Sequence, residues 1–382
     1  MAPMLFSPLD LRGVRLKNRI VLAPMLTYAA EHGRISDWHL AHLGKFAVGG
    51  VGLVFMESTK VDPRGCTTIR DAGLWKDDFI EPLRRVTDFI KAQGAVPGIQ
   101  LSHSGRKARH SVPWEGRAPL LQAVNVEDGG EWDLIGPSAA PHAEGYPVPR
   151  ELTSGEIKDL IGTWGQAADR ARRAGFDVIE LHAAHGYLIH EFLSPDANRR
   201  TDAYGGSFAN RIRFAVEVVD EVRRYWPDEK PLFVRISSVD DMGWTIEDSV
   251  ALARVLKAHG VDVIDCSSGG IGSHTLDAAQ PPDYGYQVPF AERIRTGADI
   301  ITMAVGLIIH ADQAESILNE GRADLVALGR ELLHNPNWSI DAAQKLGYMP
   351  SSAGIPEAYG YWLDKRSASG FAGKPSTWQR GI

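Results

Sequence analysis

Short runs of apolar, mostly branched residues recur along the whole chain, and longer segments between them repeat apolar residues every three or four positions. A short apolar run predicts a strand that is buried on both faces, and the three-to-four spacing predicts an amphipathic helix. The predicted strands are residues 19–23, 51–57, 96–101, 178–181, 232–236, 261–266, 300–304 and 325–328. Helices are predicted at residues 38–47, 79–93, 154–174, 208–225, 246–259, 289–295 and 311–320.

This alternation indicates an α/β protein in which each strand is followed by a helix or a turn-rich excursion. Eight such units are typical of a closed (β/α)8 TIM barrel, in which helices cover a parallel sheet. An open, doubly wound sheet is the main alternative, and it would carry a Gly-x-Gly-x-x-Gly turn after its first strand. Pro24 and Met25 stand there instead, so we predict the barrel.

Two stretches do not fit the strand–helix alternation. Residues 102–152, after the third strand, form the longest irregular segment, and a loop of this length usually caps a functional site. Residues 351–382 are rich in Gly, Ser and Pro but carry Tyr359, Tyr361 and Trp362. We therefore predict a barrel domain over residues 1–350 and a C-terminal tail that docks in part, on this chain or on a neighbouring subunit.

The composition narrows the range of partners. The 382 residues carry a net charge of −7, which argues against nucleic acid or an anionic membrane as a partner. The two cysteines, Cys66 and Cys266, offer no disulfide framework and suit a reducing compartment. Because no apolar run reaches about 18 residues and the N-terminus lacks the pattern of a signal peptide, we expect a cytoplasmic protein.

The segment 176–187 contains the densest group of proton-handling side chains. An apolar strand ends in His182, His185 and Tyr187 around Gly186. The carboxyl ends of barrel strands carry active sites, although a solvated loop with incidental histidines is the simpler alternative. Zinc binding is a further alternative, but the pair lacks the HExxH spacing and has no nearby cysteine. We expect no metal: two neutral imidazoles can donate to one substrate oxygen, and Tyr187 can act as a general acid.

Two polar residues interrupt otherwise apolar strands. Gln100 ends the third strand, and its amide suits a ligand with an imide edge unless it bonds to neighbouring loop backbone. Arg235 lies within the fifth strand, where a guanidinium requires an anion or an acceptor-rich ligand. A structural ion pair with Glu180 or Asp265 is the alternative for Arg235.

The last two strands end in Gly306 and in Gly329-Arg330. In TIM barrels the loops after these strands commonly form a phosphate site, because glycine backbone and a guanidinium can approach an anion closely. The first strand runs into residues 23–28, which place backbone groups and Tyr28 at the mouth, although Met25 could simply fill the core. A phosphorylated ring cofactor with an imide edge fits this combination, and FMN is such a cofactor.

Several motifs then make a family resemblance recognisable. They are His182-Ala-Ala-His185-Gly-Tyr187, Glu191-Phe-Leu-Ser-Pro, Asn198-Arg-Arg-Thr-Asp-Ala-Tyr-Gly-Gly-Ser, Asn210-Arg211, Gln100-Leu-Ser-His-Ser-Gly-Arg-Lys and Gly329-Arg330-Glu-Leu-Leu. The chain resembles the old yellow enzyme family of FMN-dependent ene-reductases over nearly its whole length. It looks closest to the bacterial xenobiotic reductases and thermophilic-type old yellow enzymes.

The resemblance implies roles for individual residues. FMN would be held by Ala23, Pro24, Met25, Leu26, Thr59, Gln100, His182, Arg235, Gly306, Gly329 and Arg330. His182 and His185 would bind the activating oxygen of the substrate, Tyr28 and Trp362 would line the pocket, and Tyr187 would deliver a proton. The family is usually dimeric or tetrameric, so a homodimer or homotetramer is expected.

The chain departs from this branch at two positions. Leu26 stands where a cysteine usually contacts the flavin, and Thr59 stands where a small alanine is common. A leucine cannot supply the hydrogen bond of a thiol. We hypothesise that the Thr59 hydroxyl partly replaces that donor.

The implied reaction is the reduction of an activated C=C bond. NADPH or NADH would reduce FMN, and an α,β-unsaturated carbonyl or nitro compound would then accept the hydride. Related demethylases and dienoyl-CoA reductases carry iron–sulfur clusters, for which two cysteines are too few. A flavin-binding sensor without turnover and a cofactor-free barrel lyase remain as alternatives from other classes.

Overall fold

The computed structural model describes residues 2–121, 127, 130–272, 282–348 and 354–369. Eight parallel strands close into a barrel in the order β10-β11-β12-β3-β4-β5-β8-β9. Their bounds are β3 (Ile20–Leu22), β4 (Leu53–Lys60), β5 (Val96–Ser102), β8 (Val178–Ala183), β9 (Leu232–Ser237), β10 (Val263–Ser267), β11 (Ile301–Val305) and β12 (Leu325–Leu328). The prediction of a closed (β/α)8 barrel is confirmed, with each predicted strand present.

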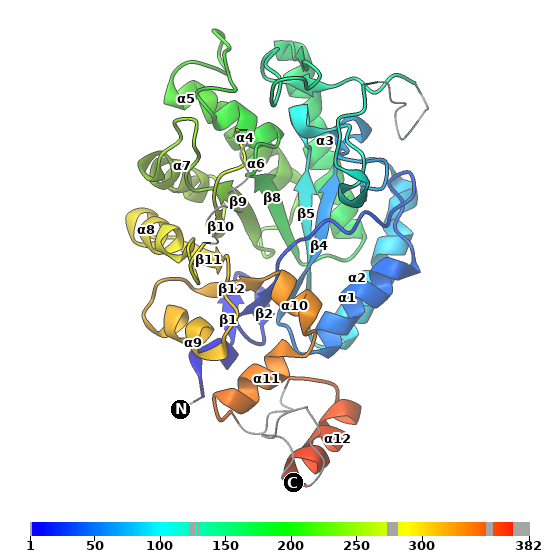
Figure 1. Ribbon diagram of the computed structural model, residues 1–382, viewed down its shortest axis with the longest axis vertical. Helices are drawn as coiled ribbons and strands as arrows, with labels where there is room; N and C mark the ends of the chain where they lie inside the picture. Colours follow the sequence, from blue (N-terminus) through cyan, green and yellow to red (C-terminus); the bar gives the residue numbers. More distant parts are fainter. Residues whose placement is uncertain (1, 122–126, 128–129, 273–281, 349–353, 370–382) are drawn as a thin grey trace.

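Helices surround the barrel (Figure 1). They are α1 (Asp37–Val48), α2 (Ile80–Ala92), α3 (Ser154–Arg173), α6 (Arg213–Tyr225), α7 (Ile246–Ala258), α8 (Val288–Ala298) and α9 (Ala311–Asn319). The predicted helix 208–225 is divided at Ile212 into α5 (Phe208–Arg211) and α6. Thr153 caps α3: its side chain accepts a hydrogen bond from the backbone N–H of Glu156, and the Glu156 carboxylate accepts one from the backbone N–H of Thr153.

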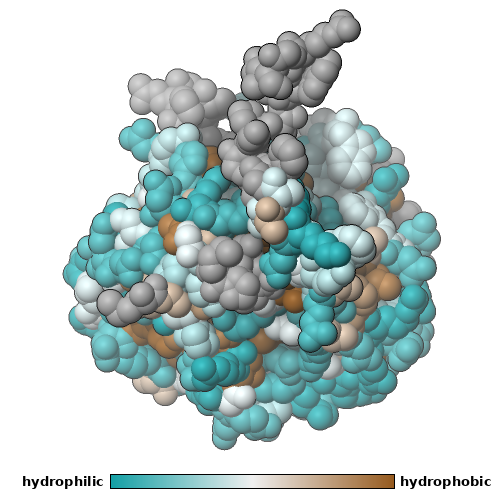
Figure 2. All heavy atoms as spheres, turned by 90° about the horizontal axis from the view of Figure 1, so that it is seen from below, coloured by the Kyte–Doolittle hydropathy of each residue, from teal (hydrophilic) through white to brown (hydrophobic). Residues whose placement is uncertain are grey.

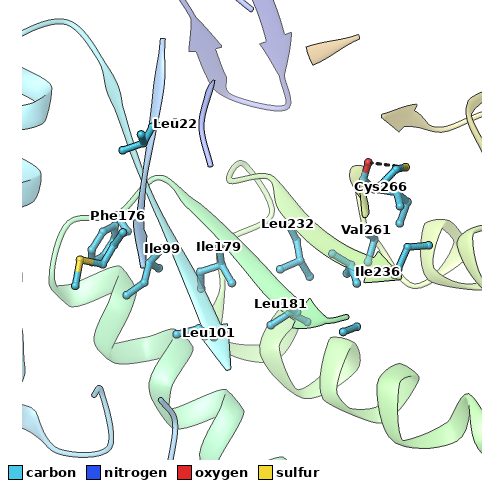
Figure 3. Close-up of a cluster of buried hydrophobic side chains, with 14 of the residues drawn as sticks. Leu22, Ile99, Leu101, Phe176, Ile179, Leu181, Leu232, Ile236, Val261 and Cys266 are labelled. Carbon is cyan, nitrogen blue, oxygen red and sulfur yellow. Dashed lines mark hydrogen bonds between the residues drawn. The ribbon is translucent and has the colours of Figure 1, made fainter. Parts of the chain in front are cut away.

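Alternating residues of the strands contribute to two separate hydrophobic cores. One core lies between the strands and the helices, and Figure 3 labels ten of its side chains, among them Ile99, Leu101, Ile179 and Leu181. The other fills the barrel interior. Its members include Leu11, Leu16, Val21, Leu53, Phe55, Val178, Phe233, Met303 and Leu325. Because side chains alternate between the two faces of a strand, the residues two and four positions after Val178 also point inward.

A two-stranded hairpin closes the amino end of the barrel. It consists of β1 (Leu9–Leu11) and β2 (Val14–Leu16), and Leu11 and Leu16 pack with the interior core. The opposite end of the barrel is formed by the carboxyl ends of its strands. The polar side chains that the sequence singled out lie at this end.

A β-bulge changes the alternation near the end of β4. Met56 pairs with Ile99, but Ser58 pairs with Gln100, so Glu57 is an extra residue in the strand. Ser58 therefore shares the inner face with Gln100. Thr59 pairs with Leu101, whose side chain belongs to the outer core.

The predicted excursion after β5 is confirmed as a cap over the carboxyl end. It contains β6 (Ile135–Gly136) and β7 (Arg150–Glu151). Trp132 is fully buried and donates from Nε1 to the carbonyl of Arg64 at 3.0 Å, and the backbone N–H of His110 donates to the carbonyl of Thr67 at 2.7 Å. These bonds fix the excursion to the loop that follows β4.

The C-terminal segment forms α10 (Arg330–His334), α11 (Trp338–Lys345) and α12 (Glu357–Ala368). In α12 the aromatic side chains remain outside: Tyr359, Tyr361 and Trp362 are 54%, 55% and 66% exposed. Figure 2 views the molecule from the end at which Figure 1 shows α11 and α12, and hydrophobic residues form separate patches there. The predicted tail boundary at residue 351 and residues 370–382 lie outside the described residues.

None of the helices that the structure describes combines the length and the apolar character that crossing a membrane would require.

Candidate active site

The two predicted substrate-binding histidines lie together at the carboxyl end of β8. His182 is the fifth residue of the strand, and its Nδ1 accepts a hydrogen bond from the backbone N–H of Ala184 at 3.2 Å. The neutral ring therefore carries its proton on Nε2. This Nε2 is 3.4 Å from Nδ1 of His185, which follows in a turn with a φ of 59°. One oxygen atom between the rings can lie within hydrogen-bond distance of both nitrogen atoms.

A serine at the end of β10 faces the outer nitrogen of His185. Nε2 of His185 is 2.7 Å from Oγ of Ser267. The Ser267 hydroxyl can also donate to Oε1 of Gln287, but over a longer distance of 3.4 Å. When it donates to Nε2, the shorter contact, the proton of His185 lies on Nδ1. Both facing nitrogens are then donors toward a shared acceptor.

Both imidazoles are neutral at neutral pH. Burial holds the pKa of His182 well below its ordinary value, and the neighbouring His185 and Arg235 add to this effect. Burial also lowers the pKa of His185, helped by the charges of Arg235 and Lys107. Because neither ring is a permanent cation, the pair donates hydrogen bonds without itself needing a counter-ion.

The predicted proton donor lies beside the histidine pair. The ring of Tyr187 is 4.6 Å from the ring of His182, centroid to centroid, and the side chain is nearly buried. Tyr187 immediately precedes α4 (Leu188–Leu193), so the helix start fixes its backbone. Its hydroxyl lies 3.5 Å from Oγ1 of Thr67, in the loop after β4.

A buried lysine lies behind this tyrosine. Nζ of Lys60 is 5.0 Å from the centre of the Tyr187 ring, and Lys60 itself is fully buried. The ammonium group donates to Oγ of Ser58 at 2.8 Å and to Oγ of Ser104 at 3.1 Å, and it lies 3.5 Å from a carboxylate oxygen of Asp71. Ser104 is in turn 2.7 Å from Thr67, which connects this polar network to Tyr187.

The floor of the site combines an amide with three charged side chains. Nε2 of Gln100 donates to Glu180 at 2.8 Å, and Nε of Arg235 is 3.1 Å from Asp265. Burial raises the pKa of both carboxyl groups. The distance between Arg235 and Asp265 shows that the alternative of a structural ion pair is present. Gln100 bonds to the side chain of Glu180 and not to loop backbone. Within the described part of the chain, the two terminal nitrogens of Arg235 make no hydrogen bond and remain free for a ligand.

The glycines predicted to bind phosphate end two adjacent strands. Gly306 follows β11 with a φ of 112°, which strongly favours glycine, and an added Cβ would lie 2.7 Å from Nε2 of Gln287. Gly329 follows β12, and its added Cβ would lie 3.2 Å from the sulfur of Met25. β12 pairs with both β11 and β3, so these strand ends and Arg330 share one side of the rim.

The end of β3 completes that side of the rim. Ala23 is buried, and residues 24–28 are partly exposed. The backbone N–H of Thr27 donates to Glu57 at 2.7 Å, and burial raises the pKa of that carboxyl to about 7. The ring of Tyr28 meets Trp114 of the excursion edge-on, at 5.8 Å between centroids. Tyr28 therefore contacts the excursion, and its place in a substrate pocket stays a prediction.

The structure does not bring two of the predicted residues to the site. The bulge in β4 turns Thr59 to the outer face, where its hydroxyl donates to the carbonyl of Glu57 at 2.7 Å. Trp362 lies on α12, at the other end of the molecule from α4 (Figure 1). In this chain Trp362 is exposed to solvent, and a contact with the site of a neighbouring subunit stays a prediction.

Comparison with known proteins agrees with this geometry. The model of the NADH:flavin oxidoreductase / NADH oxidase family matches residues 4–348. The chain belongs to this family. It is 47% identical to an NADPH dehydrogenase of Geobacillus sp. (strain WCH70) over 351 residues, which are 91% of this chain and 96% of that protein. The corresponding protein of Bacillus subtilis (strain 168) is 44% identical with the same coverage.

Solved structures lead to the same family. Morphinone reductase is similar with a TM-score of 0.73 and 28% identity, covering 91% of this chain and 90% of that chain. A 2-naphthoyl-CoA reductase has a TM-score of 0.80 and 26% identity, but the chain spans only 52% of its length. The resemblance to old yellow enzymes is confirmed: the protein is an NAD(P)H-dependent flavin oxidoreductase with FMN as its cofactor.

The residues at the rim fit FMN. Unused donors of Arg235 and the amide of Gln100 face the interior, where a polar ring edge would satisfy them. The strand ends at Gly306 and Gly329 carry no side chains, and Arg330 adjoins them. Ser58 is a candidate that the sequence analysis missed, because only the bulge in β4 brings it to the inner face.

Sequence reasoning also missed the residues behind and beside Tyr187. Lys60, Thr67 and Ser104 support the tyrosine, and His110 and His142 come from the excursion. Lys60 lies three residues beyond the predicted strand 51–57, so nothing in the hydrophobic pattern indicated that its ammonium group is buried. The irregular excursion has no periodicity from which the direction of its side chains could be read.

Proposed function

We propose that the protein reduces the activated C=C bond of α,β-unsaturated carbonyl or nitro compounds. The observation that carries this proposal is the arrangement of three side chains: Nε2 of His182 and Nδ1 of His185 lie 3.4 Å apart, with the Tyr187 ring 4.6 Å from His182. Two donors converge on one acceptor position, and a weakly acidic phenol stands beside it.

The histidine pair holds and polarises the substrate. A carbonyl or nitro oxygen accepts hydrogen bonds from His182 and His185, which orients the conjugated alkene over the barrel mouth. Negative charge grows on that oxygen as the β-carbon is reduced, so the two bonds strengthen in the transition state. FMN, once reduced by NADPH or NADH, supplies the hydride.

Tyr187 completes the reduction by protonating the α-carbon. Its ring lies 4.6 Å from that of His182, and a phenol can act as a general acid. The nearby Lys60 ammonium stabilises the negative charge that the phenol acquires on donation. Thr67 contacts the phenol oxygen and fixes its direction.

Cyclohexenone reduction by the purified yellow protein tests this function. With NADPH as the reductant in D2O, the expected product is cyclohexanone with deuterium at the α-carbon. His182→Ala, which removes one of the two donors, should reduce kcat/KM by about 10²–10³-fold, because one such donor contributes roughly 2.7–4 kcal/mol to the transition state. Oxidation of NADPH with oxygen as the acceptor serves as the control and should persist. Failure of the wild-type protein to reduce any activated alkene would refute the proposal.

A further inference from the structure

A small cavity extends from Tyr187 toward the excursion. Its volume is about 180 Å³. The residues that line it are Thr67, Lys107, His110, Arg117, His142, Tyr146, Tyr187 and Gly272. It adjoins the proton donor directly, so a group bound there belongs to a molecule at the reaction site.

The lining of this cavity is basic. Arg117 is a cation, Lys107 adds an amine that donates to the carbonyls of His185 and Gly270, and His110 and His142 add two imidazoles. The lining contains no Asp or Glu among the residues that the structure describes. Tyr146 holds the two imidazoles in a row, with its ring 5.6 Å from that of His110 and 5.4 Å from that of His142. The excursion supplies all five of these side chains.

Two nitrogens in this row lack partners. Nδ1 of His110 and Nδ1 of His142 are buried and accept or donate no hydrogen bond in the described structure. His110 is only 6% exposed. A buried polar atom without a partner costs about 1–3 kcal/mol, so a site that keeps two of them side by side is built for a ligand that bonds to them.

The positive charges in the cavity also act on one another. Burial lowers the pKa of Lys107 to about 7, and the charges of Arg117 and Arg106 lower it further in the same direction. Burial and the charges of Lys107 and Arg106 lower the pKa of His142 to about 3. A negatively charged group in the cavity would relieve this mutual repulsion.

The acidic groups nearby do not neutralise the cavity. Glu191 accepts a hydrogen bond from the backbone N–H of Arg106, and burial raises its pKa to about 8, so it is protonated at neutral pH. Asp241 lies close to Gly272 at the edge, where an added Cβ on the glycine would be 2.9 Å from the carboxylate. Arg106 and Arg117 both act electrostatically on Lys107, so two guanidinium groups stand against the one carboxylate at the edge.

We propose that this basic cavity, formed by Lys107, His110, Arg117 and His142, binds the anionic group of the alkene substrate. The natural substrate is then an activated alkene that also carries a carboxylate. The inference rests on the proposed function, since it assigns a charge to the substrate of the same site. The phosphate of the nicotinamide donor is also an anion and could bind to the same side chains. The cavity adjoins Tyr187, however, and Tyr187 protonates the alkene, so the alkene substrate is favoured as the occupant.

Matched substrates test the assignment. Cyclohexenones that carry a carboxylate on a saturated ring carbon are compared with their methyl esters, because the substituent then leaves the conjugated system unchanged. The wild-type protein should show a higher kcat/KM for at least one acid than for its ester. Titration of the oxidised flavin absorbance with the saturated acid and ester gives the binding constants separately from turnover.

Two cavity variants and one surface variant give the decisive comparison. Arg117→Gln and His142→Phe should each reduce kcat/KM for the acid, the first by about tenfold, as expected from the loss of one charge-assisted hydrogen bond. In both variants the loss should be larger for the acid than for the ester. The matched control is Arg224→Gln, which removes the same charge from a side chain on α6 that is 75% exposed. It should leave kcat/KM unchanged for both the acid and the ester.

The outcomes separate the possible explanations. Equal effects of Arg117→Gln on acid and ester, or no preference for any acid, would overturn the anionic substrate while leaving enone reduction intact. If the cavity variants slow only flavin reduction by NADPH and leave reduction by NADH unchanged, the cavity binds the phosphate of the donor. That result would also overturn the proposal of an anionic substrate. If neither acids, esters nor cyclohexenone are reduced at all, the failure lies with the proposed function itself.

Discussion

The two halves of the barrel interior contain side chains from the same strands but differ in character. The half at the amino end is apolar, and the half at the carboxyl end is polar. Toward the amino end, Val178 and Phe233 belong to a closed apolar core. Two residues further along the same strands stand the ionisable side chains of Glu180 and Arg235, which are buried, and burial raises the pKa of Glu180. In this upper half Oε2 of Glu180, Nε of Arg235 and both carboxylate oxygens of Asp265 are buried without a hydrogen-bond partner.

The comparison shows where the fold depends on a ligand. The lower half is complete by packing alone, and such a core contributes stability in proportion to the apolar area that it buries. The upper half is an incomplete polar network, which costs stability until further partners are supplied. A two-residue step along a strand thus separates the part that holds the barrel together from the part that requires FMN and substrate.

The largest effects should come from breaking a buried ion pair in the upper half. Lys60→Met removes the cation beside the buried Asp71 carboxylate, which keeps its hydrogen bonds from Thr67 and Thr68, and should lower the free energy of unfolding by about 3 kcal/mol. The double variant Lys60→Met/Asp71→Leu should recover part of that loss, since both charges are gone although the donors of Thr67 and Thr68 lose their acceptor. Urea unfolding of the two variants measures the difference, and equal destabilisation of both would contradict the interpretation.

A deletion in the lower half should cost a similar amount for a different reason. Phe233→Ala removes a fully buried ring from the apolar interior and should destabilise by about 3–5 kcal/mol. Its kcat per folded, flavin-loaded molecule should stay within about twofold of the wild type. A large loss of kcat at full flavin loading would mean that the two halves are not separable.

A buried carboxyl on α4, outside the barrel interior, should make stability depend on pH. Burial raises the pKa of Glu191 to about 8, above the ordinary value near 4.5, so the folded state keeps a proton that the unfolded state loses. The stability that this carboxyl contributes is present below its unfolded pKa and is lost as pH rises through about 8. Relative to the wild type, Glu191→Gln should therefore gain stability between pH 5 and 8, by up to about 1.4 kcal/mol per pH unit. Thermal unfolding across this range checks the slope, and a constant difference would show that Glu191 is ionised in the fold.

The smallest effect concerns the tautomer of His185. Ser267→Ala removes the hydroxyl that faces Nε2 of His185, so the proton is no longer directed to Nδ1. We expect kcat/KM for enones to fall about fivefold, the value of roughly one neutral hydrogen bond. Ser339→Ala, at another buried serine on α11, is the control and should leave turnover unchanged. An unchanged rate in Ser267→Ala would mean that the tautomer is set in another way.

The lower half and most of the rim could be predicted from the sequence, because strand alternation determines which residues share a face. His182, Arg235 and Gly306 follow this rule directly, and the family motifs supported it. Thr59 could not be predicted correctly, since the bulge that displaces it leaves no mark in the hydrophobic pattern. The basic cavity was missed for another reason: His110 and His142 lie in irregular backbone, where only tertiary contacts set the direction of a side chain.

The account depends most directly on the pairing of the histidines with Tyr187. Anaerobic stopped-flow measurements on the wild type and Tyr187→Phe, first with NADPH and then with cyclohexenone, separate flavin reduction from alkene reduction. We predict an unchanged rate of flavin reduction and a rate of flavin reoxidation by the enone that is lower by about 10²-fold or more, as expected for the loss of a general acid. Reoxidation by cyclohexenone at the wild-type rate in Tyr187→Phe, with the saturated product still formed, would contradict it.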